Sequence, residues 1–301
     1  MNYHNPVLLN ESIEGLSVQA EGTYVDATFG GGGHSKEILK RLGSGHIFCF
    51  DQDEDALQNV PDDERIIFIN ENFRFMKNFL LLHKATPVDG ILADLGVSSY
   101  QLDNSLKGFS TRFDGPLDMR MSKNISLTAR QVVNEYSEAE LKKIFMLYGE
   151  LKNSTKIAAE IVQARKNNEI ETTSSLVEVL RRFAHKGKEN KFFAQVFQAL
   201  RIQVNNELES LKELLKQSLD VLKPGGRLVI ISYHSLEDRL VKNFMKSGNL
   251  EGTIEKDFYG NLLSPVKQVG KMIIPDDSEI DRNKRARSAK LRIAEKLKNN
   301  D

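Results

Sequence analysis

Several residues and segments that mark particular kinds of protein are scarce in this chain of 301 residues. Its one cysteine, Cys49, cannot form an intramolecular disulfide or a cysteine-based zinc site, and it predicts a reducing compartment. The six histidines show no paired ligand spacing, so we expect no bound metal. No apolar run approaches the roughly 20 residues that span a bilayer, and no leader begins the chain, so we expect a cytoplasmic protein without a membrane partner.

Net charge is also lacking, because Lys plus Arg and Asp plus Glu both number 42. Any polyanion must therefore be bound by local patches of charge. What the chain does contain is a β-branched run that enters four consecutive glycines, Gly30 to Gly33, and then a helix start. Glycine allows positive φ angles and a close approach of the backbone to a ligand, so this segment predicts a binding site.

Short apolar runs alternate with helical stretches over the first hundred residues, which predicts an α/β fold with a parallel, doubly wound sheet. The predicted strands are Tyr24 to Thr28, His46 to Phe50, Ile66 to Ile69, Val88 to Leu92 and Arg227 to Ser232. The predicted helices between them include Ser35 to Arg41 and Phe73 to His83.

The middle of the chain has no strand-like runs, so we expect an all-helical insertion over residues 104–206 between two parts of the core, 1–103 and 207–301. Ser137 with Glu140, and Ser175 with Glu178, predict two helix starts in it. Pro224-Gly225-Gly226 predicts a break before the fifth strand, and the last residues read as a basic C-terminal tail.

Asp51 follows the predicted strand His46 to Phe50, about twenty residues beyond the glycines. An acid at this place in nucleotide-binding folds accepts hydrogen bonds from ribose hydroxyls. For Asp53 to Asp55 we expect a solvated acidic helix start. His34 and Ser35 stand where a dinucleotide fingerprint requires close packing, which disfavours NAD and is compatible with S-adenosylmethionine. Alternatively, His34 only hydrogen-bonds the local backbone.

Asp94 ends the fourth predicted strand, next to the crevice where ligands bind in open α/β sheets. The exocyclic amine of cytosine or adenine is a poor nucleophile, so its methylation needs acceptors that orient it, and Asp94 is the candidate catalytic residue. The alternative is a carboxylate that binds the cofactor or caps a turn.

Ordered motifs at matching spacing resemble the bacterial 16S ribosomal RNA cytosine N4-methyltransferase family, called RsmH or MraW, over nearly the whole chain. These motifs are His4–Leu9, Thr28–Ser35, Asp94–Ser99, Gln101–Asp103, Asp114–Met121, Phe197–Ile202, Ser232–Arg239 and Arg285–Ser288. The resemblance implies a class I (Rossmann-like) core whose helical insertion helps to recognise the substrate. It also implies S-adenosylmethionine as methyl donor and a cytosine in the decoding centre of the small ribosomal subunit as target.

Carried over to this sequence, the family's cofactor contacts fall on Gly32, Gly33, His34, Asp51, Phe73, Asp94 and Gln101. A core aromatic is the equal alternative for Phe73. Many aminomethyltransferases follow the acid with two prolines and an aromatic residue, whereas this chain has Leu95-Gly96-Val97. The residue that stacks on the target base is therefore open, with four candidates: Tyr100, Phe109, Tyr233 and His234.

Three groups of basic residues are candidates for contacts with RNA phosphates. Seven basic residues and one acid lie between Lys284 and Lys298. Arg112 and Arg120 flank Asp114-Gly115-Pro116 beside the predicted pocket. A third cluster lies in the insertion: Arg181, Arg182, Lys186, Lys188 and Lys191. For its three lysines we expect a solvated face.

Two other classes of function are compatible with a nucleoside pocket: an NAD-dependent oxidoreductase and a non-enzymatic RNA-binding assembly factor. The position of Cys49 inside a predicted strand argues against a covalent cysteine nucleophile. The residues leave open whether the protein forms a homodimer.

Overall fold

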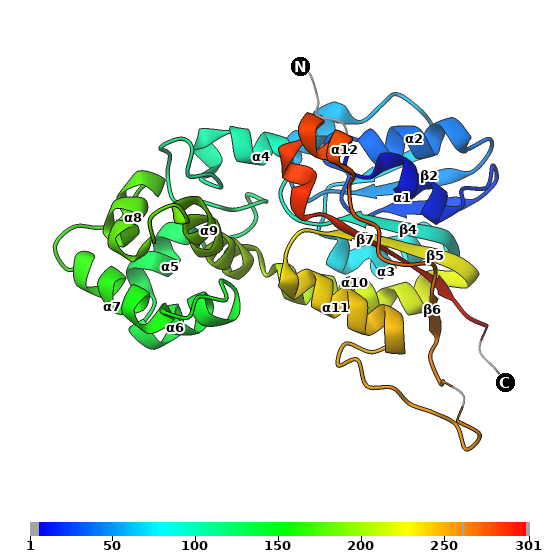
Figure 1. Ribbon diagram of the computed structural model, residues 1–301. Helices are drawn as coiled ribbons and strands as arrows, with labels where there is room; N and C mark the ends of the chain where they lie inside the picture. The colour runs from blue at the N-terminus through cyan, green and yellow to red at the C-terminus, as the bar shows by residue number, and fades with distance from the viewer. Residues whose placement is uncertain (1–5, 261, 299–301) are drawn as a thin grey trace. The chain divides into compact units, whose positions relative to one another are not determined.

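The computed structural model describes residues 6–260 and 262–298, so His4 and Asn5 of the first motif lie outside the described residues. The chain forms two compact units, Met1–Gly96 with Leu208–Asp301, and Val97–Glu207 (Figure 1). The predicted insertion, 104–206, lies inside the second unit. No helix in the described part of the chain combines the length and apolar character needed to cross a bilayer.

The first unit is built on a seven-stranded sheet with the order β3-β2-β1-β4-β5-β7-β6. Its first five strands are parallel, whereas β7 runs antiparallel to both β5 and β6. The strands are β1 (Thr23–Asp26), β2 (His46–Phe50), β3 (Ile66–Ile69), β4 (Val88–Asp94), β5 (Leu222–Ser232), β6 (Val266–Gln268) and β7 (Lys290–Lys296). The predicted α/β class and the five predicted strands are confirmed.

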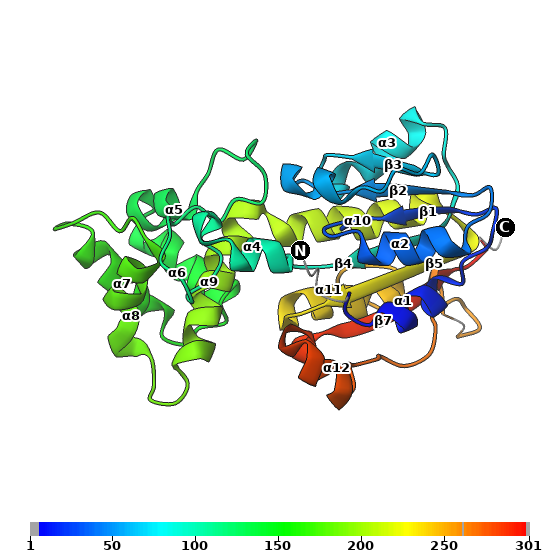
Figure 2. The ribbon, with the colours of Figure 1, turned by 90° about the horizontal axis from the view of Figure 1, so that it is seen from above.

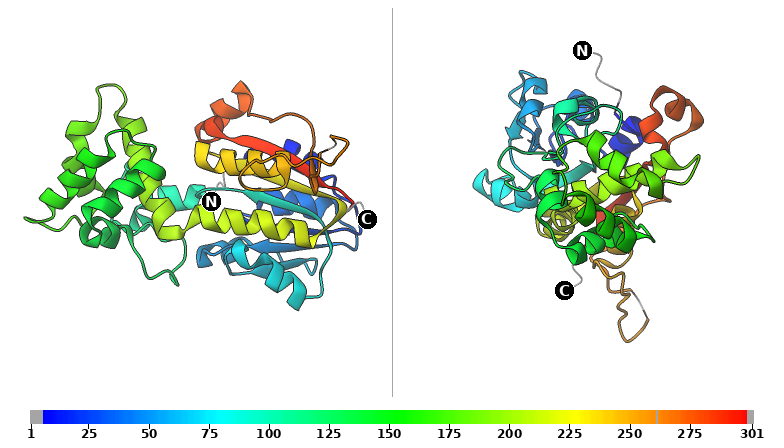
Figure 3. Two further views of the ribbon diagram at one scale, coloured as in Figure 1. Left: turned by 90° about the horizontal axis from the view of Figure 1, so that it is seen from below. Right: turned by 90° about the vertical axis from the view of Figure 1, so that its left-hand side faces the viewer.

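Helices cover both faces of this sheet. Helices α3 (Met76–Leu82), α10 (Glu207–Val221) and α11 (Ser235–Ser247) pack on one face, the one seen in the left view of Figure 3. Helices α1 (Leu9–Leu16) and α2 (Gly33–Arg41) cover the other face, seen from above in Figure 2. Alternate residues of each central strand enter one core or the other, which explains their continuous apolar runs. Cys49 is fully buried in this packing.

Strand β5 includes the Pro224-Gly225-Gly226 segment that predicted a break. Leu222 pairs with Val88, and pairing resumes at Arg227 with Gly90, so the residues between them bulge out of the ladder. The φ angle of Gly225 is +82°, which glycine adopts at little cost. The predicted break is therefore a bulge within one strand.

The predicted basic C-terminal tail is wrong, because the segment forms strand β7 beside β5. Leu291 and Ala294 are fully buried, and they hold the strand in the sheet. Arg292 and Lys290 pair with Asp238, at 2.8 and 3.1 Å. The ammonium of Lys296 donates to the Leu222 carbonyl oxygen. The three basic side chains of β7, Lys290, Arg292 and Lys296, are therefore bound within the protein.

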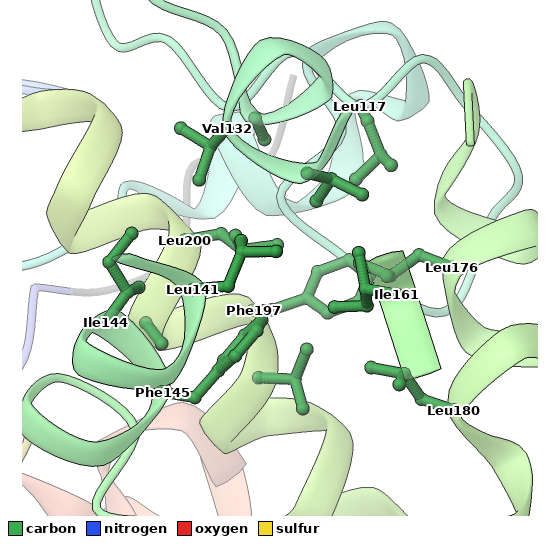
Figure 4. Packing of buried hydrophobic residues seen from close by; sticks show 14 of the residues in the cluster. Leu117, Val132, Leu141, Ile144, Phe145, Ile161, Leu176, Leu180, Phe197 and Leu200 are labelled. Carbon is green, nitrogen blue, oxygen red and sulfur yellow. The ribbon is translucent and has the colours of Figure 1, made fainter. Parts of the chain in front are cut away.

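The second unit contains six α-helices and no named strand. They are α4 (Ser99–Asp103), α5 (Ala129–Glu135), α6 (Glu138–Leu147), α7 (Ser154–Ala164), α8 (Thr173–Leu180) and α9 (Glu189–Asn205). Figure 4 shows their common core, in which Phe145, Leu176, Phe197 and Leu200 lie. Phe109 is also buried in this core, so its assignment as a stacking candidate is wrong.

The helix starts predicted in the second unit meet different outcomes. Ser137 caps α6, with Glu140 completing the capping box as predicted. The start predicted at Ser175 is wrong, because Thr172 caps α8 and Ser175 fills the third helical position. The threonine hydroxyl accepts the Ser175 N–H, so the chain enters the helix two residues earlier.

Over residues 6–260 and 262–298, five short 3₁₀ segments complete the secondary structure, together with helix α12 (Asp277–Arg282) of the first unit. They are η1 (Glu54–Asn59), η2 (Phe73–Phe75), η3 (Ser105–Lys107), η4 (Arg181–Phe183) and η5 (Lys284–Ser288). The helix predicted over Phe73 to His83 is thus η2 followed by α3.

Candidate functional site

Three carboxylates lie at the carboxyl edge of the sheet, where parallel strands end side by side. Asp26 ends β1, Asp51 follows β2, and Asp94 ends β4, and these strands are neighbours in the order β2-β1-β4. The Asp26 charge raises the pKa of both Asp51 and Asp94. Sequence reasoning missed Asp26, although an acid that closes an apolar strand just before a glycine run is a recognisable signal.

The glycine loop connects β1 to α2 with two residues in the left-handed region, Gly30 at φ +51° and Gly32 at φ +72°. A Cβ on Gly32 would lie 2.7 Å from the Phe29 ring, and one on Gly33 would lie 2.2 Å from Pro6. A Cβ on Gly30 would meet only the Thr28 carbonyl oxygen, at 4.0 Å, so the Gly30 backbone borders open space. The loop is therefore tightly packed at Gly32 and Gly33 and open at Gly30.

Both oxygens of the Asp51 carboxylate accept backbone hydrogen bonds. Oδ2 accepts the Gly30 N–H at 2.7 Å, and Oδ1 accepts the Asp53 N–H at 2.8 Å. Burial raises the pKa of Asp51 to about 6, against the lowering effect of these two bonds. Asp51 therefore ties the glycine loop to the end of β2.

The solvated helix start predicted at Asp53 is wrong for that residue. Asp53 is buried, and its side chain accepts the Asp55 N–H as the N-cap of η1. A short polar cap tied to its own backbone costs less to bury than a free carboxylate.

His34 is buried at the start of α2, with its side chain turned into the protein. Its Nε2 lies 3.1 Å from the Val7 carbonyl oxygen, and because a carbonyl only accepts, Nε2 carries the proton. Burial lowers the pKa of His34 to about 4, so the ring is neutral. The side chain thus hydrogen-bonds the backbone, as the alternative predicted, but the partner is 27 residues away and not local. Because Val7 binds the one ring N–H, the donor that His34 can offer a ligand is its backbone N–H.

The residue after His34 closes the buried side of the loop. The Ser35 hydroxyl donates to Asp26 Oδ2 at 2.6 Å and lies 3.1 Å from the Cys49 sulfur. Burial raises the pKa of Asp26 to about 6 and that of the Cys49 thiol well above its usual range. This cluster holds β1, β2 and α2 together.

Asp94 is partly exposed and is held by two neighbouring elements. Its N–H donates to the Thr28 hydroxyl at 2.7 Å, and its Oδ1 accepts the Tyr233 hydroxyl at 2.7 Å. Burial raises the pKa of Asp94 to about 7, with further increases from nearby acids and a decrease from the Tyr233 hydrogen bond. Such a carboxyl group can exchange a proton near neutral pH.

The remaining predicted site residues are placed less centrally. Phe73 is half-buried in η2 and packs against the core under α3, so part of its ring is exposed. Gln101 is buried in the second unit, where its Oε1 accepts the Ser98 N–H at 3.0 Å in the capping box of α4. Tyr100 is exposed beneath the Lys107 ammonium, and His234 caps α11.

Of the two arginines predicted near the target base, Arg120 is committed to the protein itself. Its guanidinium donates to both oxygens of Asp118, at 2.8 Å each, and to the Ile125 carbonyl oxygen. Arg112 is exposed. In the insertion cluster, Arg181 and Arg182 pair with Glu178 and Glu160.

The first unit has a cavity of about 300 Å³ beside the Tyr233 side chain. The start of α11 and η5 form its polar wall, with Ser235, the exposed Arg287 and Ser288. Ile274 and Pro275 form its apolar wall. Arg287 and Ser288 belong to the last predicted motif, which therefore borders the cavity.

Comparison with known proteins identifies the chain's relatives. It matches the MraW methylase family over residues 1–297. The ribosomal RNA small subunit methyltransferase H of Flavobacterium johnsoniae is 60% identical over 298 residues, 99% of each chain. That of Christiangramia forsetii is 58% identical over 298 residues, again 99% of each.

Solved structures align with the chain at much lower identity. An rRNA methylase from Streptococcus thermophilus gives a TM-score of 0.42 at 14% identity, covering 96% of this chain and 95% of that one. TrmN from Thermus thermophilus gives 0.44 at 11%, covering 96% and 48%. The α/β unit is a class I methyltransferase core, and the chain belongs to the MraW methylase family.

Proposed function

We propose that this protein transfers a methyl group from S-adenosylmethionine to the N4 amine of a cytosine in the decoding centre of 16S ribosomal RNA, within the small ribosomal subunit. The observation that carries the proposal is Asp94, held at the carboxyl edge of the sheet between Thr28 and Tyr233. Relatives at 60% and 58% identity are named small subunit ribosomal RNA methyltransferases. Such a substrate places the protein in the cytoplasm.

The charge of the site favours this cofactor over a dinucleotide. When bound, S-adenosylmethionine supplies an electrophilic methyl group on a positively charged sulfur. Asp26, Asp51 and Asp94 form an anionic edge that suits a cation, whereas the pyrophosphate of NAD would meet like charge. The open backbone at Gly30 gives the ligand room beside them.

The chain offers a partner for each part of the cofactor. The Asp51 oxygens retain acceptor capacity for ribose hydroxyls after their two backbone bonds. Backbone N–H groups of Gly33 and His34, in the first turn of α2, suit the carboxylate of the methionine end. The Gly32 N–H already donates to the Phe29 carbonyl oxygen, so the contact at Gly32 stays a prediction from the family resemblance. The exposed part of the Phe73 ring suits the adenine face. Gln101 stays a prediction from the family resemblance.

Asp94 orients the nucleophile in this proposal. Tyr233 holds Oδ1, and no hydrogen bond to Oδ2 arises from residues 6–260 and 262–298. Oδ2 then accepts an N–H of the cytosine amine, which aligns the nitrogen lone pair toward the methyl group. Alignment of this kind is worth roughly 7–11 kcal/mol over the bimolecular reaction. The same carboxylate accepts the proton that the amine loses.

An RNA contact in this proposal comes from an exposed cation near Tyr233. Arg287 borders the cavity beside that residue, and a phosphate of the target strand suits its guanidinium. A cytosine must leave its stack to reach the methyl group, so an unstacked base in the decoding centre suits the site. We assign substrate recognition to the helical insertion as well.

The test incubates the protein with S-adenosylmethionine labelled in its methyl group and small subunits from a strain lacking the enzyme. We expect label in the RNA as N4-methylcytosine, and none with Asp94→Ala. Binding of subunits without labelling would instead indicate an assembly factor. Calorimetric titration in which NADH saturates the protein and S-adenosylmethionine gives no heat would indicate an oxidoreductase.

The rate of methyl transfer should depend on the ionisation of Asp94. Because the pKa of Asp94 is raised to about 7, its charged fraction grows as the pH rises through neutrality. We expect the single-turnover rate to increase with pH and to level off above the pKa that Asp94 has in the complex. A rate that stays constant between pH 5.5 and pH 8.5, roughly 1.5 units on either side of neutrality, would contradict a role for the charged form of Asp94.

A further inference from the structure

Tyr233 lies directly beside Asp94, although 139 residues separate them in the chain. Strand β5 is parallel to β4, and Asp94 pairs with Ile231 in the ladder. Tyr233 follows two residues later, just beyond the edge of the sheet. The topology therefore brings a tyrosine to the carboxylate that the proposed function makes catalytic.

Three contacts, two of the side chain and one of the backbone N–H, fix Tyr233 in this place. Its hydroxyl donates to Asp94 Oδ1 at 2.7 Å, and its N–H donates to the buried Glu237 carboxylate at 2.9 Å. A Cβ built on Gly96 would lie 3.6 Å from the Tyr233 ring, so the ring packs against this glycine. Burial raises the pKa of Tyr233 well above its usual range, so the phenol remains a donor at neutral pH.

We propose that Tyr233 is a positioning residue for the methyl transfer, which holds one oxygen of Asp94 so that the other is free to receive the amine. This proposal rests on the proposed function. Tyr233 touches Asp94 and need not touch the substrate, so its hydroxyl acts through the carboxylate. The stacking role that was open for Tyr233 is not required.

The Tyr233 hydroxyl also counteracts the effect that nearby negative charges have on the pKa of Asp94. Asp26 from β1, Glu237 from α11 and Glu279 near the end of the chain all disfavour the ionised carboxylate. The Tyr233 hydrogen bond favours it, because a donor stabilises the charged acceptor. Removing the hydroxyl should therefore raise the pKa of Asp94 and protonate more of it at neutral pH.

The test compares Tyr233→Phe with Tyr24→Phe, which removes a buried hydroxyl that accepts the Gln19 N–H elsewhere in the same unit. With Tyr233→Phe we expect the single-turnover rate at pH 7 to fall about 10- to 100-fold, as for lost transition-state positioning. The acid limb of the pH–rate profile should move to higher pH. Affinity for S-adenosylmethionine should change by less than about threefold. Tyr24→Phe should leave the profile in place.

An independent measurement separates this proposal from the proposed function. Carbon-13 NMR of the Asp94 carboxyl in the ligand-free protein should give a higher pKa in Tyr233→Phe than in the unaltered protein and in Tyr24→Phe. An unchanged pKa and an unmoved acid limb would overturn the proposal, and so would a defect confined to cofactor affinity. If the unaltered protein transfers no methyl group while the pKa moves, the proposed function fails and the Tyr233–Asp94 coupling stands.

Discussion

At the scale of single residues, environment decides what each polar side chain at the edge of the sheet can do. His34 and Asp51 are both predicted cofactor contacts, yet their side chains differ in what they have left to offer. The one protonated nitrogen of His34 is used by Val7, whereas each oxygen of Asp51 accepts a single backbone bond and can accept another. Burial raises the pKa of Asp51 and lowers that of His34, because it disfavours the charged form of each.

We expect Asp51→Ala to weaken the binding of S-adenosylmethionine about 10- to 100-fold, since about two ribose hydrogen bonds at 0.5–1.5 kcal/mol each are lost. Turnover with saturating cofactor should change far less. Isothermal titration calorimetry measures the affinity, and a single-turnover assay measures the rate. Full affinity in the variant would remove Asp51 from the cofactor site.

The affinity should also depend on pH. The raised pKa of Asp51, about 6, means that the ligand-free site binds protons that a cationic ligand must displace. Affinity for the cofactor should therefore decrease as the pH falls through that value. Asp51→Asn, which keeps the shape and removes the charge, should show a weaker dependence.

At the scale of elements, the turn between β1 and α2 depends on how closely the chain can pack around glycine. Gly32 combines φ +72° with a space that the Phe29 ring already fills. Gly225, in the bulge of β5, has a similar φ of +82° and nothing within 4 Å. Both positions therefore require a left-handed backbone, but only Gly32 also lacks room for a side chain.

We expect Gly225→Ala to destabilise the protein by about 1–2 kcal/mol through its left-handed backbone alone. Gly32→Ala should cost roughly 1–3 kcal/mol more, because its Cβ overpacks the Phe29 ring. It should also weaken cofactor binding, which Gly225→Ala should leave unchanged. Denaturant unfolding and calorimetry measure the two effects. Equal behaviour of the variants would show that the loop tolerates a side chain.

At the scale of the whole molecule, the described residues form three hydrophobic cores. Two lie on the two faces of the sheet, and the third lies among the helices of residues 97–207. Except for Gln101, every predicted cofactor contact belongs to the first unit. Stability of the second unit and affinity for the cofactor should therefore be separable.

Phe197→Ala, in the core shown in Figure 4, should destabilise the second unit by about 3–5 kcal/mol. The half-exposed Phe113 of the same unit provides the control, and its change to alanine should cost less than about 1 kcal/mol. Hydrogen exchange of residues 97–207 measures the loss. At about room temperature we expect the cofactor affinity of the variant to remain within about twofold of that of the unaltered protein. A large drop in affinity would show that the second unit supports the cofactor site.

The sequence by itself determined the parallel core. Strands buried on both faces must be apolar throughout, and β2 was predicted with its observed ends. The apolar run of the partly buried edge strand β3 also predicted its observed ends. The carboxyl ends of such strands meet at one edge, so Asp51 and Asp94 could be assigned to a site without coordinates. The glycine run marked the turn that lies between them.

Only the tertiary structure decided which groups are occupied and which are paired across the chain. The basic residues of β7 looked like a phosphate-binding tail until Asp238 and the Leu222 carbonyl were seen to bind them. Local patterns do not reveal such partners, because the contacts span 52 to 74 residues. The bond between Tyr233 and Asp94 depends in the same way on β5 pairing with β4, which no spacing in the sequence records. The position of a side chain on its own strand follows from the sequence, whereas its contact partner on another strand depends on how the sheet packs.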